Sequence, residues 1–389
     1  MAVIKKLIRR TLKIAERRPW IIPLFGFVSG VASFLLVERK QEQFAQIISV
    51  LMLASWVWLA MENLLRKGIS HWFGITVPPV VLRYVNQLVH QESLFFVIPF
   101  FFITTAWNTG QVFFTSVLIA AALVSIIDPI YYHWLAARRW LYYCFHGITL
   151  FAALLTALPL IFHLPTPQSY LWSLGIAVLL TGPGLVRSMS VVWWKRTIAV
   201  VSLMLCAGGF GILVRPWIPP ASLWLTKVAI TDHIDDRNRA PKQQFKTITS
   251  AQLHAGIYAY TAIHAPRGLR ERIYHQWIHK GKKFDKIALN ISGGNDQGYQ
   301  TWTHKTNFPA DAKGDWQIQV VTEANQIIGI LRFQVVDAEA QTKPRVESAS
   351  REQRPSSSSI SKQTSAPAVA LPDVDSSQQA SSTPAPSPQ

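Results

Sequence analysis

The chain has 389 residues, and its 50% hydrophobic content and mean hydropathy of +0.20 exclude a single ordinary soluble domain. Residues 1–217 contain 18 Lys and Arg but 6 Asp and Glu, so this part of the chain carries +12 of the formal charge of +17. In a soluble protein such a charge would suggest nucleic acid. No basic stretch interleaved with aromatic residues is present, so we predict a membrane protein without a nucleic-acid partner.

Residues 1–19 contain seven Lys and Arg among spaced apolar residues, which predicts an amphipathic helix on the cytoplasmic membrane surface. Residues 20–217 then predict a membrane domain. It contains seven apolar runs near the length of about 20 residues that a span requires, at 20–37, 44–61, 93–107, 111–127, 140–162, 170–186 and 197–214. The third run is short and extends back toward Val80, and the sixth ends in Thr181-Gly-Pro-Gly184.

Basic residues predict the orientation of these spans. With the N-terminus in the cytoplasm, the cytoplasmic segments contain 15 Lys and Arg, whereas the outer loops contain Arg39 and Lys40, with Arg215 at the outer end of the last span. This asymmetry follows the positive-inside rule. An odd number of spans places everything after Pro216 outside, which is the periplasm in a Gram-negative bacterium. We therefore predict a multi-pass inner-membrane protein with a periplasmic C-terminal domain.

The connector Arg215-Pro-Trp-Ile-Pro-Pro220 ends the last predicted span. Arg and Trp suit the headgroup layer, and the prolines both stop the helix and stiffen the link. We therefore expect the next domain to be held close to the membrane. Residues 218–337 alternate apolar and polar positions, at 253–260, 286–291, 315–320 and 329–335, which predicts a small all-β antiparallel sandwich. We expect Trp277, Trp302 and Trp316 to lie in its core.

Residues 338–389 contain 13 Ser and 7 Pro but no aromatic residue, so we predict a disordered tail. The two cysteines, Cys144 and Cys206, lie in separate apolar runs, which excludes Cys-x-x-Cys motifs and cysteine-based zinc sites. No zinc-protease, nucleophile-elbow or phosphate-loop motif occurs. We therefore predict no metal and no cofactor.

The amino-acid sequences of several segments, and their order along the chain, indicate a family. These segments are 90–100, 125–132, 136–141 and 154–159 in the membrane domain, and 274–281, 298–303 and 314–321 in the β domain. They resemble a family of uncharacterised bacterial inner-membrane proteins. In that family a multi-span domain of unknown function precedes a periplasmic β domain of unknown function. The resemblance covers nearly everything except the tail. It implies this architecture, and it implies no activity, substrate or catalytic residue.

A candidate polar cluster lies at the cytoplasmic end of the predicted bundle and consists of Arg83, His90, Glu92, Asp128 and His146. Arg83, Gln87 and His90 share one helical face by their spacing. Ionisable groups inside a span are costly and are therefore functional candidates. Structural roles are the alternative: Asp128 before Pro129 suits a helix N-cap, Arg83 and Glu92 suit interfacial positions or an ion pair, and His146 suits one inter-helix hydrogen bond.

A candidate binding face in the β domain consists of His254, Tyr258, Tyr260 and His264, opposite the apolar positions of the same predicted strand. An exposed aromatic stripe suits a glycan or a protein. The alternative is that both tyrosines pack beneath a neighbouring strand or against the membrane domain. His275 and His279 are four residues apart on another predicted strand, which is too far for them to share a metal ion.

Two functional hypotheses follow. In the first, the lipid bilayer holds a non-enzymatic protein that presents its β-sandwich to a periplasmic protein or glycan partner, with signal relay through the bundle. In the second, the polar cluster serves a membrane-embedded transporter or enzyme, and the β domain is regulatory. Spans interrupted by Pro99 or Pro183 favour a transporter, whereas few buried charges and no evident repeat disfavour one.

Overall fold

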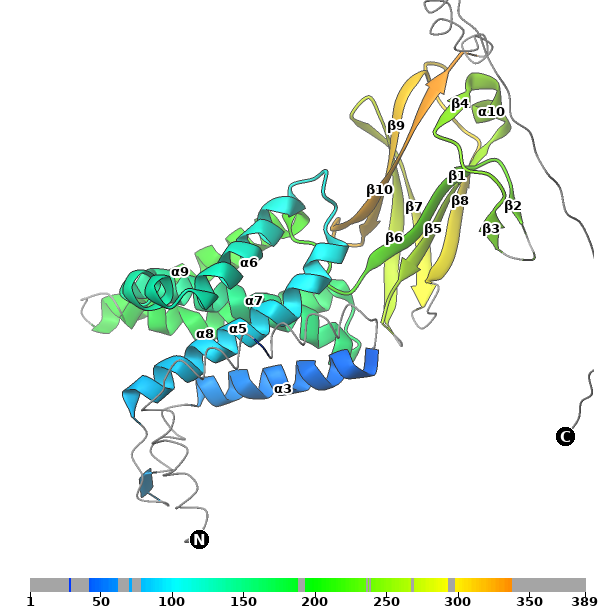
Figure 1. The fold of residues 1–389 in the computed structure, drawn as a ribbon. Helices are drawn as coiled ribbons and strands as arrows, with labels where there is room; N and C mark the ends of the chain where they lie inside the picture. Colours follow the sequence, from blue (N-terminus) through cyan, green and yellow to red (C-terminus); the bar gives the residue numbers. More distant parts are fainter. Residues whose placement is uncertain are drawn as a thin grey trace, which may run out of the picture. The chain divides into compact units, whose positions relative to one another are not determined.

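The computed structural model describes residues 42–61, 78–187, 193–235, 239–266, 269–292 and 298–337, together with residues 28, 70, 71 and 237. The predicted basic segment, nearly all of the first predicted span and the predicted tail lie outside these residues. The described part consists of a helical N-terminal region followed by a β domain (Figure 1).

Long helices occupy the positions of the other predicted spans. They are α3 (Glu42–Ala60), α5 (Pro79–Thr104), α6 (Gln111–Ile126), α7 (Arg139–Phe162), α8 (Thr166–Arg187) and α9 (Trp193–Val214). Among the described residues, three helices are both long and apolar enough to cross a membrane, at Val81–Thr104, Arg139–Phe162 and Trp194–Trp217. α3 and α6 contain shorter apolar stretches. The described chain therefore has three candidate spans rather than the seven predicted.

α5 and α8 confirm two details of the predicted runs. α5 begins at Pro79, so the third predicted run does extend back past Val80, and proline at the first helical position is favourable because its missing N–H has no partner there. α8 (Thr166–Arg187) ends one residue after the predicted run 170–186 and continues through Pro183, so Thr181-Gly-Pro-Gly184 lies in its last part without ending it.

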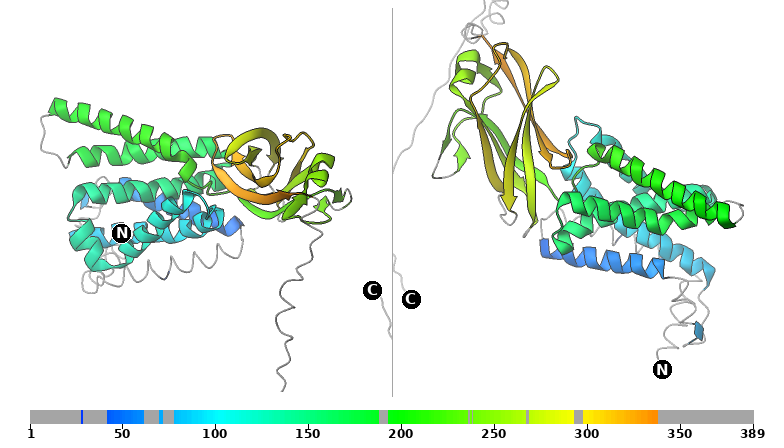
Figure 2. Two further views of the ribbon diagram at one scale, coloured as in Figure 1. Left: turned by 90° about the horizontal axis from the view of Figure 1, so that it is seen from above. Right: turned by 180° about the vertical axis from the view of Figure 1, so that it is seen from behind.

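α7 lies at the centre of the helical region and packs against α3, α5 and α8, whereas α9 packs against α8 at the edge (Figures 1 and 2). The apolar segment of α7 is 72% buried inside the protein, whereas the apolar segment of α9 is 6% buried. Large side chains such as Leu205 and Leu213 are therefore exposed along α9. Such a surface suits lipid contact, because acyl chains are as apolar as these side chains.

The β domain contains two sheets that enclose one core. The first sheet has the order β1 (Trp224–Thr231), β5 (Ile257–His264), β8 (Tyr299–Lys305), and the second has the order β4 (Thr247–Thr249), β10 (Ile327–Val336), β9 (Gly314–Thr322), β6 (Arg270–His279), β7 (Lys282–Ser292). β2 (Ile234–Asp235) pairs with β3 (Ala240–Pro241). β10 and β4 are parallel, while the other paired strands are antiparallel. The sandwich is therefore mixed rather than wholly antiparallel.

Trp277 and Trp316 are buried in the core of the sandwich, as predicted. Trp302 instead packs with Tyr260 in a small cluster on the other side of the first sheet, so its assignment to the core is wrong. The hairpin between β6 and β7 closes through Lys280 and Gly281, whose φ angles are 47° and 77°. Two consecutive positive φ angles match the right-handed twist of the flanking strands and explain the glycine.

A short helix replaces the predicted start of one strand. α10 (Ser250–Ala255) covers the first half of the alternating stretch 253–260, and β5 begins only at Ile257. The helix is started by a capping box, in which the Thr249 side chain accepts from the Gln252 N–H and the Gln252 side chain accepts from the Thr249 N–H. Leu253 is the one buried residue of α10, so a single apolar contact suffices to fix it.

Candidate functional site

Two histidines of the candidate polar cluster contact each other inside the helical region. His90 on α5 is fully buried, and its Nε2 lies 2.9 Å from Nδ1 of His146 on α7. The other ring nitrogen, Nδ1, lies 2.8 Å from the hydroxyl of Tyr131. Trp56 on α3 covers the pair, with its ring 4.9 Å from that of His146, while its Nε1 donates to the Ser93 hydroxyl at 2.8 Å.

The two histidines and Tyr131 form a continuous hydrogen-bonded chain. If the Tyr131 hydroxyl donates to His90 Nδ1, then His90 Nε2 donates to His146 Nδ1, and the opposite set of donors satisfies the same contacts. Conversion of one neutral set into the other requires that a proton enters at the Tyr131 oxygen and that another leaves from His146 Nε2, because a shift within the chain alone would leave a phenolate and an imidazolium. This arrangement can therefore pass a proton between α5, α7 and the segment that carries Tyr131.

A second group of polar contacts surrounds Gln87, one turn before His90 on α5. The Gln87 amide nitrogen donates to Asp128 Oδ1 at 2.7 Å and to the Ser125 carbonyl at 3.0 Å, and its oxygen accepts from the Tyr132 hydroxyl. Asp128 thus bonds to a neighbouring helix. No side-chain cap is present at the start of the helical segment that follows it, so the predicted N-cap is wrong.

That segment, η1 (Ile130–Leu135), is a π-helix. The wider turn places the adjacent residues Tyr131 and Tyr132 so that one bonds His90 and the other bonds Gln87. π-Helical turns are rare and occur frequently at functional sites. η1 therefore joins the two polar groups into one buried network.

The remaining cluster residues are placed differently. Arg83 is exposed on α5, and Glu92 is half-buried and has an interaction of its own. His133, which lies on η1 near the cluster but is not part of it, is exposed. The structure therefore brings His90, His146 and Asp128 into one network through Gln87 and the two tyrosines. Sequence spacing identified the face of α5, but it missed the partners from other helices: Trp56, Ser93, Ser125, Tyr131 and Tyr132.

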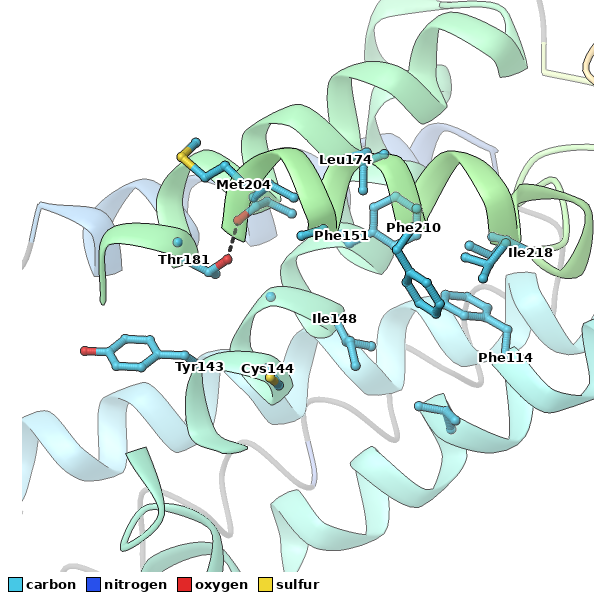
Figure 3. A pocket seen from close by; sticks show the side chains of 18 of the residues that line it. Phe114, Tyr143, Cys144, Ile148, Phe151, Leu174, Thr181, Met204, Phe210 and Ile218 are labelled. Carbon is cyan, nitrogen blue, oxygen red and sulfur yellow. Dashed lines mark hydrogen bonds between the residues drawn. The ribbon is translucent and has the colours of Figure 1, made fainter. Parts of the chain in front are cut away.

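An apolar groove of about 590 Å³ lies between α6, α7, α8 and α9. Figure 3 shows Phe114, Phe210 and Ile218 gathered at one end, with Tyr143 and Thr181 toward the other. The Thr181 hydroxyl already donates to the Ala177 carbonyl at 2.6 Å. No residue of the candidate polar cluster lines the groove, so these two features of the helical region are separate.

The candidate binding face of the β domain is only partly assembled. His254 lies on α10 and does not share the strand with Tyr258, Tyr260 and His264, which lie on β5. Each of these three rings stacks on the ring of the residue opposite it on the neighbouring strand. The distances between ring centres are 4.2 Å for Tyr258 and His304, 6.5 Å for Tyr260 and Trp302, and 3.8 Å for His264 and Trp224.

Exposure differs along this row of stacked pairs. Tyr260 is only 1% exposed and packs with Ile234 of β2, so the alternative of burial beneath a neighbouring strand applies to it. Tyr258 and His264 are half-buried, and His304 is exposed. The accessible part of the face therefore centres on the Tyr258–His304 pair and the Trp224–His264 pair.

His275 on β6 has a structural role in the core of the sandwich. His275 is buried between the sheets and contacts the Thr261 and Thr303 hydroxyls at 3.1 Å and 3.0 Å. Burial lowers its pKa to about 3, so the ring is neutral at ordinary pH. Within the described ranges, no three His, Cys, Asp or Glu side chains are arranged to hold a metal ion.

Three hydrogen bonds join the described part of the β domain to the helices and to the connector. The Thr166 N–H, at the start of α8, donates to the Glu271 carboxylate on β6 at 2.7 Å. The Gln111 amide on α6 donates to the Ile327 carbonyl at 2.8 Å, and the Gln326 amide donates to the carbonyl of Ile218 in the connector at 3.0 Å. Residues 218–220 of the connector are buried, as are the three residues that follow. The β domain thus contacts the helices directly, while its closeness to the membrane stays a prediction.

Glu271 is the ionisable group of this junction. It is 4% exposed, and burial raises its pKa to about 7, against the opposite effects of the Thr166 hydrogen bonds and of Arg215. Arg215 lies at the end of α9 with its guanidinium 4.7 Å from the centre of the Tyr170 ring. Sequence reasoning missed Glu271, because nothing local in β6 distinguishes it from a surface glutamate.

Comparison with known proteins identifies families without an assigned activity. Residues 270–335 match a family that is described as protein of unknown function, DUF2914. No curated protein matches the chain. The solved structure of the Pseudomonas fluorescens alkylpurine DNA glycosylase AlkC bound to DNA containing an abasic site analog matches with 12% identity, covering 77% of this chain and 99% of that chain. Its TM-score is 0.21, so this likeness supports no inference.

The N-terminal match is the longer one and covers residues 1–259, which include the helical region and the first strands of the β domain. The chain therefore belongs to the family of unknown function DUF5924.

Proposed function

We propose that this chain is a multi-pass inner-membrane protein that presents its β-sandwich in the periplasm as a binding or scaffolding module. The helical region anchors the module and relays its state across the membrane. Three candidate spans and the concentration of Lys and Arg in the predicted cytoplasmic segments support this proposal. Three spans, like any odd number, would place the β domain outside when the N-terminus is cytoplasmic.

The junction at Glu271 is the observation that carries the proposal. A carboxylate beside the first N–H of α8 stabilises that helix end, because the helix dipole is positive there. A partner that displaces β6 would therefore alter the stabilisation of α8. The hydrogen bonds of Gln111 and Gln326 add two further points at which a displacement of the sandwich reaches the helices.

The exposed parts of the first sheet are the best-supported surface for a partner. Stacked pairs such as Tyr258–His304 present rigid aromatic area together with hydrogen-bonding groups, which suits both glycan and protein recognition.

Removing residues 221–389 tests the proposal. If the sandwich is the functional module, the truncated chain loses the cellular function while its amount in the membrane stays unchanged. Alanine at Tyr258 and His304 together should weaken the same function, with alanine at the exposed Lys283 of β7 as the control. Full function in the truncated chain would contradict the proposal.

A second candidate function rests on the His90–His146–Tyr131 chain. Its two alternative sets of donors suit proton transfer within a membrane-embedded transporter or enzyme, with the β domain as the regulatory part. Alanine at His90, Asp128 and His146 would then abolish function even though the β domain is intact. Unchanged function in these variants, at unchanged protein level, would exclude this candidate.

A further inference from the structure

The apolar groove between α6 and α9 is unused by either candidate function. Two candidate spans, α7 and α9, contribute to its lining. In a bilayer the groove therefore lies among acyl chains. Its volume of about 590 Å³ falls within the range of about 300–1,000 Å³ that is typical of ligand sites.

The groove is built by close helix packing rather than by loose packing. The Tyr170 hydroxyl of α8 donates to the Gly211 carbonyl of α9 at 2.5 Å, and a Cβ at Gly211 would approach Leu174 to 2.6 Å. At Gly147 of α7, a Cβ would meet Thr181 of α8 at 3.3 Å. Glycines thus allow the close approach of α7 to α8 and of α8 to α9, while α6 contributes Phe113, Phe114 and Val117 to the lining of the groove.

The lining of the groove favours a hydrocarbon occupant. Water requires two or more polar partners in a cavity, but the lining is almost wholly apolar and the Thr181 hydroxyl is already bonded to a carbonyl. An empty groove would forfeit the dispersion contacts of its lining. An acyl chain supplies these contacts without any hydrogen bond.

One end of the groove offers a position for a lipid phosphate. Val214 and Trp217 line this end, and Arg215 lies between them with its guanidinium against Tyr170, another lining residue. Two guanidinium nitrogens, Nε and Nη2, are buried and have no hydrogen-bond partner within the described part of the chain, so the Arg215 side chain has to turn toward the groove for a phosphate to reach them. Arginine binds phosphate through such N–H groups, and Arg and Trp favour the headgroup layer.

We propose that the groove holds one acyl chain of a phospholipid from the surrounding bilayer, with the lipid phosphate at Arg215. The lipid then fills the space between α6 and α9. It also makes packing contacts with the end of α9, where the connector to the β domain begins. This site is independent of the binding surface on the sandwich.

The full-length wild-type protein provides the first test. Purified in mild detergent and examined by native mass spectrometry, it should retain one phospholipid. A phospholipid with a photoreactive acyl chain should crosslink to groove residues such as Cys144 and Ala207 more than to Leu205 and Leu213, which lie on α9 outside the groove.

Two matched substitutions on α9 provide the second test. Ala207→Phe places a ring in the groove and should raise the dissociation constant of the lipid about tenfold, the effect of about 1.4 kcal/mol. The fraction of protein with bound lipid should fall accordingly. Leu213→Phe changes a side chain that is 77% exposed and should leave this fraction unchanged. Arg215→Gln should lower retention of the phospholipid.

Uniform crosslinking along α9 in the wild-type protein, or no retained lipid, would overturn the proposal, and neither result depends on the folding of a variant. Crosslinks from Cys144 to residues 20–37 of the same chain, or to a second copy, would also overturn it by identifying a protein segment as the occupant.

Discussion

Glu271 is the residue at which pH should act on the junction. Burial disfavours its charged form more than the Thr166 N–H favours it, so its pKa rises from 4.5 to about 7 in the folded chain. Between these two values the folded chain binds more protons than the unfolded chain. The free energy of unfolding therefore falls as pH rises from about 4.5 to about 7, by a total on the order of 3 kcal/mol.

We expect Glu271→Gln to remove this component of the pH dependence, because the amide is neutral at every pH and its oxygen still accepts from Thr166. The measurement is the melting temperature of the full-length protein between pH 5 and pH 8. Asp232→Asn is the control, since Asp232 is exposed and lies outside the junction. Parallel pH profiles for wild type and Glu271→Gln would show that the buried carboxyl is not the titrating group.

The histidine pair should behave as a coupled unit. His90→Phe leaves the Tyr131 hydroxyl and His146 Nδ1 without their buried partner, which costs about 1–3 kcal/mol. His146→Phe removes one of the same contacts, so the double variant should lose less stability than the sum of the single variants. The exposed His133 provides the control substitution. Additive losses in chemical denaturation would mean that the two rings act independently.

The sequence predicted that His90, Asp128 and His146 were unusual, because ionisable groups in apolar helices are costly. It did not predict that the two imidazoles touch. That contact depends on α5 packing beside α7, and the contact of His90 with Tyr131 depends on η1. No local pattern determines which helices are neighbours. The same limit explains why Trp56 and Glu271 were missed.

At the scale of elements, the packing of α9 on α8 depends on Gly211. Gly211→Ala should separate the two helices, because the new Cβ would lie 2.6 Å from Leu174, and we expect a loss of about 1–3 kcal/mol from overpacking. Gly209→Ala is a matched control two residues away, where nothing lies within 4 Å of a Cβ. Thermal unfolding in detergent measures both variants. Equal melting temperatures would contradict the close packing of these helices.

Element boundaries were predicted best where the apolar run is continuous. The predicted span 140–162 differs by one residue from α7 (Arg139–Phe162). The start of β5 was wrong because residues 253–260 alternate apolar and polar positions, while the signal for α10 lay just before them in Thr249 and Gln252. The parallel pairing of β4 with β10 joins residues far apart in the chain, and alternation within a strand carries no information about such pairing.

At the scale of the whole molecule, the proposed orientation is directly testable. A reporter enzyme that is active only in the periplasm should be active when it follows Val336 and inactive when it is inserted after Arg187, in a predicted cytoplasmic segment. The physical reason is the positive-inside distribution of Lys and Arg. The opposite pattern would place the sandwich in the cytoplasm.

Crosslinking of the β domain in intact cells tests the central claim most directly. A photoreactive amino acid replaces His304 on the candidate binding face or Lys283 on the second sheet, both exposed positions. We predict that the His304 position captures a periplasmic protein or glycan, that the Lys283 position does not, and that Tyr258→Ala reduces the capture. No partner at either position, together with full cellular function in a chain that ends at Pro220, would contradict the account.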